Sequence, residues 1–202
     1  GVDGLSLFLI LLTTFLTPIC IVFSFRSIKK NLNFFVILLL VMESLLIVTF
    51  SVLDLITFYV FFESILIPMF LLIGIWGSRS RRIRAAYYLF NYTLVGSILM
   101  LLGILYIYSK LGTTNYYALV GYPFSDYEQL GLWLLFFIAF SVKMPVVPFH
   151  IWLPEAHCEA PTSGSVILAG ILLKLGGFGF LRYSLGLFYD SSAFFAPFVF
   201  VI

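Results

Sequence analysis

The chain has 202 residues, of which 62% are hydrophobic and only 10% are charged, with a formal net charge of +2. Soluble domains are about 45–50% apolar and about 25% charged, so this composition indicates an integral membrane protein. So few charges exclude a nucleic-acid surface, and two cysteines exclude a disulfide framework or a four-cysteine metal site.

Apolar segments long enough to cross a membrane follow one another along the chain. A hydrocarbon core of about 30 Å needs about 20 helical residues. The apolar stretch at 33–76 would be about 66 Å long as one helix, so we expect two crossings with a turn near Asp54. Open sheet edges cannot face lipid, so all spans are expected to be helices. The remaining predicted spans cover 5–25, 83–109, 129–152, 162–186 and the beginning of another at 193–202.

The charges between these spans predict two sides. One side holds the basic loops at 26–32 and 77–84 and a later loop at 153–161. Basic loops favour the cytoplasmic or matrix side. The arginines at 79–84 are also compatible with a contact to anionic lipid or to a partner protein.

Four charged residues lie at middle depths of predicted spans: Glu43, Glu63, Lys143 and Lys174. A charge near the bilayer centre costs about 2.5–3.5 kcal/mol on insertion scales, so it needs a partner or water. One interpretation is a proton relay parallel to the membrane plane. The other is a set of structural ion pairs that hold helices together. As a relay, a buried Glu–Lys pair keeps both charges while the groups are close, and the lysine can release its proton when they separate. Arginine would not serve, because its guanidinium stays charged.

Two of the helices that carry these charges are predicted to be irregular. Pro145 and Pro148 follow Lys143, and each removes a backbone donor, which predicts a broken helix of the kind found in transporters. The helix of Lys174 continues into a glycine-rich run at 176–179. This run is compatible with a helical bulge or with close packing.

His150 and His157 flank Trp152 at the predicted mouth on the basic side. Their spacing of seven residues without a cysteine pair is a poor match to a zinc site, and no metal is expected. A proton-uptake role suits an imidazole that titrates near neutral pH. A structural role at a helix end is the other interpretation.

The string SVKMPVVPFHIWLPEAHCEAPTSGSVILAGILLKLGGFGFLR at 141–182 resembles the subunit 4 family of antiporter-like membrane subunits of respiratory complex I. GVDGLSLFLILLTT at the start and FYVFFESILIPMFLLIGIWGSR at 58–79 fit the same family, in its mitochondrial form. The resemblance implies an all-α bundle of fourteen transmembrane helices in two inverted repeats. It also implies that Glu63 is essential, that Lys143 lies in the first broken helix, that Lys174 is the central lysine, and that Glu43 matches an acidic residue of the preceding helix.

The same resemblance implies how the chain is divided. A leading helix is expected at 1–30, a five-helix inverted repeat at 31–190, and the start of a second repeat at 191–202. Family members are more than twice this length, so a separate polypeptide or a longer form is expected to supply the missing helices. No targeting segment is expected, because neither a basic n-region nor a cleavage site precedes Gly1 in this sequence.

The implied function is proton translocation in the membrane arm of NADH:ubiquinone oxidoreductase, in the mitochondrial inner membrane, beside other membrane-arm subunits and lipids. No cofactor is expected in this chain, and flavin, iron–sulfur clusters and quinone are expected in other subunits. Two alternatives stay open. The chain could belong to a multisubunit cation/proton antiporter, or it could be a structural scaffold of the membrane arm that does not pump.

Overall fold

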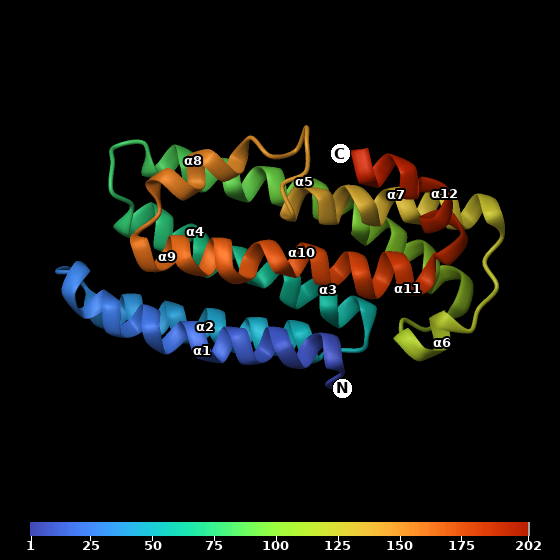
Figure 1. Cartoon of the computed structure of the whole chain (residues 1–202), viewed down its shortest axis with the longest axis horizontal. Helices are drawn as coiled ribbons and strands as arrows, with labels where there is room; N and C mark the ends of the chain where they lie inside the picture. Colours follow the sequence, from blue (N-terminus) through green and yellow to red (C-terminus); the bar gives the residue numbers. More distant parts are fainter. Residues whose placement is uncertain (202) are drawn as a thin grey trace.

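The structure is a computed structural model that describes residues 1–201, and this part of the chain is all-α (Figure 1). The helices are α1 Gly4–Ser27, α2 Leu32–Ser51, α3 Leu55–Ser64, α4 Leu66–Trp76, α5 Arg82–Leu111, α6 Tyr116–Val120, α7 Asp126–Lys143, α8 Trp152–Glu159, α9 Thr162–Ile167, η1 Leu168–Leu172, α10 Leu173–Gly179, η2 Phe180–Ser184, α11 Leu185–Leu187 and α12 Tyr189–Val201. The two η segments are π-helical turns within one continuous span. The expectation of an all-helical membrane fold is confirmed.

Five helical stretches are long and apolar enough to cross a membrane, and they lie where the sequence predicts spans. They cover Gly4–Ser27, Leu32–Ser51, Leu55–Trp76, Arg82–Leu111 and Thr162–Leu187. The stretch at 33–76 turns between Ser51 and Leu55, as the isolated charge of Asp54 indicates. The partial seventh span is present as α12.

The predicted loop at 153–161 is wrong, because most of it is the helix α8. In Figure 1, α7 runs from one end of the molecule to its middle, the chain leaves the helix at 144–151, and α8 continues towards the opposite end. Pro145 and Pro148 break the helix, and a second helical segment then completes the crossing. The true connection on the basic side is the short segment around Pro161.

The chain reversals gather at two ends of the bundle. At the basic end, the Trp76 indole donates to the Lys30 carbonyl at 2.8 Å, and the Ser78 amide donates to the Glu159 carbonyl at 3.0 Å. These bonds join the reversals at 28–31 and 77–81 to the end of α8. At the opposite end, which we call the far end, the Leu55 amide donates to the Thr114 carbonyl at 3.0 Å.

Asp54 holds the far end together by capping α3. Its carboxylate accepts from the backbone amide of Thr57 at 2.9 Å and from the hydroxyls of Thr57 and Thr114. Partial burial opposes ionisation of this carboxyl, but the hydrogen bonds from Thr114 and Thr57 outweigh burial, and the pKa of Asp54 lies below its ordinary value. The cap therefore keeps its charge at neutral pH.

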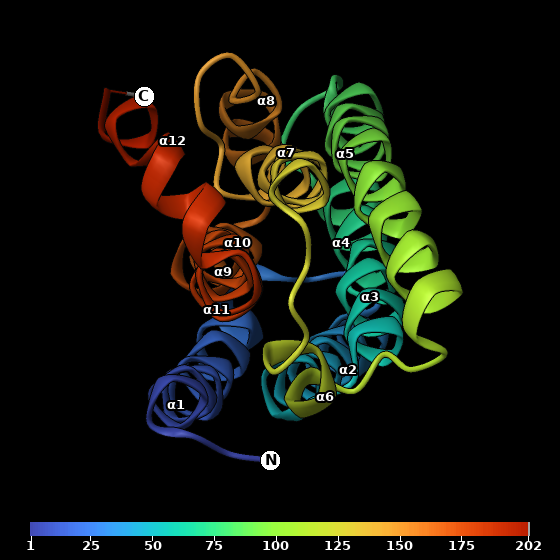
Figure 2. The same cartoon turned by 90° about the vertical axis from the view of Figure 1, so that its right-hand side faces the viewer.

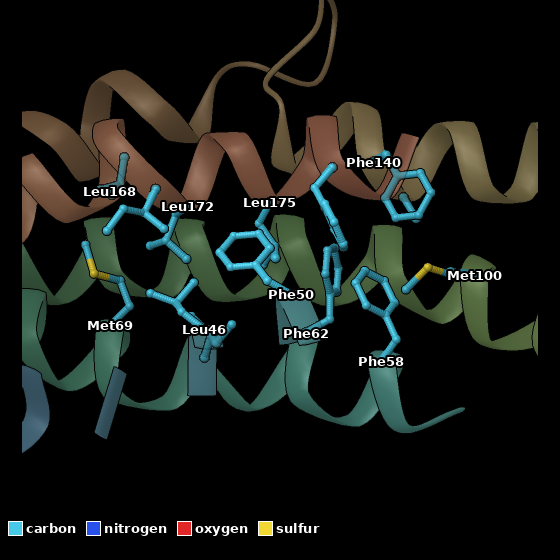
Figure 3. Packing of buried hydrophobic residues seen from close by; sticks show 14 of the residues in the cluster. Leu46, Phe50, Phe58, Phe62, Met69, Met100, Phe140, Leu168, Leu172 and Leu175 are labelled. Carbon is cyan, nitrogen blue, oxygen red and sulfur yellow. The ribbon is translucent and has the colours of Figure 1, made fainter. Parts of the chain in front are cut away.

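The core lies between α2, α3, α5, α7 and the span that contains α10. Figure 2 looks along the helices and shows α1 and α2 on one side of this span and α7 and α5 on the other. Figure 3 shows the apolar side chains that fill the interior, including Phe50, Phe58, Phe62 and Phe140. The ring centroids of Phe62 and Phe140 lie 6.1 Å apart in an edge-to-face arrangement. Phe62 of this layer contacts Lys143, which is described next.

Candidate proton-relay site

Lys143 is the last residue of α7 and lies at the helix break. Its side chain is 3% exposed. The ammonium donates to the Phe62 carbonyl at 3.3 Å and lies 4.3 Å from the centre of the Phe62 ring. A carbonyl dipole and an aromatic face both stabilise a cation. The lysine charge is therefore accommodated without a carboxylate in direct contact.

Substitute donors satisfy the carbonyls that the break would leave without partners. Pro145 has no amide hydrogen, and the Ser141 carbonyl accepts from the Val146 amide instead, at 2.9 Å. The Val142 carbonyl accepts from the buried Trp152 indole at 2.8 Å. Since an unpaired backbone group in the membrane costs several kcal/mol, these bonds hold the irregular segment in one conformation.

Glu63 lies at a second break, which the sequence analysis did not predict. The helix changes from α3 to α4 at Ile65, three residues before Pro68, which has no amide hydrogen. Oxygen Oε1 of Glu63 is buried and has no hydrogen-bond partner among residues 1–201. The carboxyl lies within electrostatic range of Lys143 and beside the Ser97 hydroxyl.

Glu63 and Lys143 are thus neighbours without being a contact pair. Ion pairs within 4.0 Å in residues 1–201 are Lys110–Glu128 and Arg182–Asp3, and neither lies between these two groups. Two helix breaks therefore meet with an acid at one and a base at the other. This arrangement is compatible with a pair that alternates between contact and separation.

Lys174 lies beyond a π-helical turn and points away from the core. Its ammonium donates to the Ala169 carbonyl at 2.9 Å, within η1. A π turn displaces backbone bonding by one residue, and such turns are frequent at functional sites. The side chain is exposed and lines a groove of about 760 Å³ between α1 and α10, whose other lining residues are apolar or glycine.

The glycines after Lys174 bring its helix against the Lys143 break. A Cβ atom on Gly176 would lie 2.9 Å from the Met144 nitrogen and 3.0 Å from the Phe140 carbonyl oxygen. A Cβ atom on Gly179 would lie 2.3 Å from the Phe140 ring. The glycine run therefore serves close packing. The run itself is α-helical, and the π turns η1 and η2 lie before and after it.

The remaining candidates do not join this group by any contact of the described residues. Glu43 is half-buried in the middle of α2. His150 is exposed in the break between α7 and α8, rather than at the mouth on the basic side. His157 is exposed in the last turn of α8. Within residues 1–201, no three His, Cys, Asp or Glu side chains are grouped as metal ligands.

Comparison with known proteins identifies the family of the chain. Residues 52–202 match the family described as "NADH:quinone oxidoreductase/Mrp antiporter, TM". The chain belongs to this family. It is also 60% identical over all 202 residues to the NADH-ubiquinone oxidoreductase chain 4 of Chondrus crispus, of which it covers 41%. The chain therefore spans less than half the length of this family member.

Solved structures show the same fold. A chain of respiratory complex I from Thermus thermophilus, solved with bound NADH, matches with a TM-score of 0.85 and 35% identity, over 98% of this chain and 42% of that one. A chain of the Mrp complex from Dietzia sp. DQ12-45-1b matches with a TM-score of 0.85 and 23% identity, over 99% of this chain and 38% of that one. The second likeness concerns the fold alone.

The sequence analysis missed two buried charges of this chain, Arg182 and Glu159. Arg182 is 5% exposed in η2 and pairs with Asp3, while its Nε and Nη1 atoms have no hydrogen-bond partner in the described part of the chain. Glu159 is 3% exposed at the end of α8, although the sequence placed it in the predicted loop at 153–161. Arg182 was detectable as a charge within an apolar span, whereas the burial of Glu159 depends on the unpredicted helix α8.

Proposed function

We propose that this chain is a proton-translocating membrane-arm subunit of respiratory NADH:ubiquinone oxidoreductase. The main support is the meeting of Glu63 and Lys143 at two helix breaks, in a chain 60% identical over its whole length to a chain 4 protein of that enzyme. The proposal includes residence in the mitochondrial inner membrane and contact with other membrane-arm subunits. Flavin, iron–sulfur clusters and quinone belong to other subunits in this proposal.

In the proposed mechanism, Lys143 alternates between two partners. When its ammonium moves from the Phe62 carbonyl to the Glu63 carboxylate, the two opposite charges stabilise one another and the lysine keeps its proton. When they separate, the lysine can pass its proton towards Lys174, since the two lysine helices touch at Gly176. Glu43, His150 and His157 are secondary members of the proposed route, for proton supply from neighbouring regions.

The apolar groove beside Lys174 suggests that further helices pack against this part of the chain. A lysine facing an apolar groove within a membrane span is costly unless other groups cover it. The chain covers 41% of the length of its Chondrus crispus relative. We therefore propose that helices corresponding to the rest of that length, from whatever polypeptide, cover the groove and continue the route. The division into 1–30, 31–190 and 191–202 is part of the same proposal.

A cation/proton antiporter subunit is the other function with the same chemistry. The family includes Mrp antiporters, and the Dietzia sp. Mrp complex shares the fold at 23% identity. The much higher identity to chain 4 proteins favours the respiratory complex. Copurification with flavin- and iron–sulfur-containing subunits would decide for the respiratory enzyme.

The test is Glu63→Gln in the assembled complex. Glutamine keeps the shape and removes the titratable charge, so assembly should persist while NADH-driven proton uptake into vesicles falls at least about tenfold. Glu128→Gln is the matched control, because Glu128 pairs with Lys110 on the surface and does not face the breaks. Full pumping by Glu63→Gln would refute the proposed relay and favour the scaffold role.

A further inference from the structure

A buried arginine lies on the same span as Lys174, and the proposed relay gives it no task. Arg182 is 5% exposed in η2 and follows Lys174 by eight residues towards the far end. Eight helical residues cover about 12 Å. A guanidinium stays charged at physiological pH, so it cannot pass a proton on. Arg182 therefore places a fixed positive charge on the far-end side of Lys174.

Two aromatic rings hold this guanidinium in place. Its central carbon lies 5.4 Å from the ring centres of both Phe178 and Tyr116. Phe178 lies one turn closer to Lys174 on the same span, and Tyr116 comes from α6. A Cβ atom on Gly186 would lie 2.5 Å from the Tyr116 hydroxyl, so close packing on α11 fixes Tyr116. Cations within about 6 Å of a ring centre are attracted to the ring face.

The negative partner of Arg182 lies on its outer side. Asp3 pairs with the guanidinium, and its side chain is 49% exposed, whereas that of Arg182 is 4% exposed. The Nε and Nη1 atoms are buried and have no hydrogen-bond partner among residues 1–201. A cation that approached from the interior of the bundle would thus meet the guanidinium before it met the carboxylate.

A dry aromatic layer continues from Arg182 into the bundle. Phe58, Phe178 and Tyr183 are at most 1% exposed. The ring centroid of Phe58 lies 4.6 Å from that of Tyr183 and 6.3 Å from that of Phe178. The Tyr183 hydroxyl has no hydrogen-bond partner in the described part of the chain, so it continues no hydrogen-bonded path through the layer.

This layer separates two carboxyl groups that α3 places along one line. Glu63 belongs to the proposed relay, and Asp54 caps the helix at the far end, about 13 Å away along the axis. Phe58 lies between them in the sequence, and Figure 3 shows it beside Phe62, with ring centroids 5.4 Å apart. A proton that passed from Glu63 to Asp54 would leave the relay at the far end of the bundle.

We propose that Arg182, together with this aromatic layer, is an electrostatic barrier that keeps the protons of the relay from leaking to the far end. The inference rests on the proposed function. A fixed cation raises the energy of any second cation nearby. Fixed arginine charges exclude protons from narrow pores in the same way. With this end closed, protons on Glu63 and Lys143 can move only along the route parallel to the membrane.

The test measures passive proton leak through the assembled complex. The complex is reconstituted in vesicles with an imposed pH gradient, without NADH, and an internal pH-sensitive dye reports the leak. Arg182→Gln should raise the leak at least about tenfold, the effect of removing a unit charge from about 10 Å away at an effective dielectric constant of about 20. With NADH, oxidation should continue while fewer protons accumulate per NADH. Arg84→Gln is the control, because Arg84 is exposed at the start of α5 and bonds to the Tyr88 hydroxyl.

Two further variants separate the charge from a structural role. Arg182→Lys keeps a cation beside Asp3 and should keep the leak near the wild-type rate. Asp3→Asn removes the ion pair but leaves the guanidinium on its two rings, so it should also leak little. If the ion pair served only to hold α1, Asp3→Asn would leak as much as Arg182→Gln. If Arg182→Gln does not assemble, Arg182→Met replaces it, because methionine fills the space between the rings without a charge.

A wild-type leak in Arg182→Gln, an equal leak in Asp3→Asn, or failure of both neutral variants to assemble would overturn this inference. Glu63→Gln separates it from the proposed function. If Glu63→Gln alone pumps normally, the relay itself fails. If it does not pump and Arg182→Gln shows no leak, only the barrier fails. Where both claims hold, Glu63→Gln added to Arg182→Gln should return the leak towards the wild-type rate, because the leak passes through Glu63.

Discussion

At the scale of single residues, the buried charge of Lys143 is stabilised by Phe62 and not by direct contact with Glu63. The ammonium has a carbonyl at 3.3 Å and an aromatic ring centre at 4.3 Å, both from Phe62. A desolvated cation–π contact is worth about 2 kcal/mol, which offsets part of the cost of burying the charge. Phe62 directly precedes Glu63, so in the proposed relay a movement of α3 relative to α7 would exchange one partner for the other. A structural ion pair would instead be expected to hold both charges in direct contact.

Lys143→Arg is predicted to abolish pumping although it preserves the charge. A guanidinium stays protonated at any physiological pH, so it cannot release a proton when Glu63 moves away. Pumping in reconstituted vesicles should fall at least about tenfold, as expected when a proton-transfer group is lost. Lys110→Arg is the control, because Lys110 is 44% exposed in its ion pair with Glu128 and has room for the larger group.

If the arginine is too large for the buried site and the complex does not assemble, Lys143→Gln replaces it in the same assay. Wild-type pumping by either variant at position 143 would reduce Lys143 to a packing role.

At the scale of helices, irregular segments concentrate around the candidate site. The break after α7 and the break at Ile65 border the region of Phe140 and Phe62, and the π turns η1 and η2 flank α10, which packs against Phe140. Non-helical backbone is tolerated in a membrane only where protein buries it or where it lines a water-filled cavity. Each break here has substitute hydrogen bonds or close packing. The two breaks are thus stabilised by the surrounding protein next to Lys143 and Glu63.

The sequence predicts some of these irregularities and not others, for physical reasons. Pro145 and Pro148 directly remove donors, so the break after Lys143 was predictable. The continuation as α8 was not, because its helix depends on tertiary contacts such as the Trp152 bond to Val142. The intramembrane charge of Glu63 was visible, but its distance from Lys143 depends on how α3 and α7 pack. The two π turns lie on either side of the glycine run, which was compatible with a bulge but did not predict where the turns occur.

Gly179→Ala is predicted to destabilise the bundle. A Cβ atom at this position would lie 2.3 Å from the Phe140 ring, so α10 would have to move away from α7. Overpacking of this kind costs about 1–3 kcal/mol. The thermal midpoint of the detergent-solubilised complex and its assembled yield should both fall. Gly131→Ala is the matched control, because a Cβ atom on Gly131 in α7 would meet nothing within 4 Å. An equal effect of both substitutions would contradict the packing argument.

At the scale of the whole molecule, the charge pattern between the spans and the geometry of the bundle agree. The reversals at 28–31 and 77–81 and the end of α8 are joined by hydrogen bonds at the basic end. The far end instead holds the Asp54 cap, α6 and the Arg182–Asp3 pair. Since each crossing reverses direction, a basic loop cannot change sides without changing every other loop. The sequence could therefore predict which loops share a side before any packing was known.

Cysteine accessibility is predicted to separate these two ends across the membrane. Cys158 and Ser78 are both exposed near the basic end. The native Cys158, and a cysteine introduced by Ser78→Cys, should therefore be labelled from the matrix side by a membrane-impermeant maleimide. Gly121→Cys, in a Cys158→Ser background, should be labelled only from the opposite side. Gly121 is exposed after α6, and a Cβ atom there would meet nothing within 4 Å, so the substitution leaves the fold intact. The buried Cys20 is the internal control and should react only after detergent unfolding. Labelling of positions 78 and 121 from the same side would contradict the arrangement, because an odd number of crossings, α5 alone, lies between them.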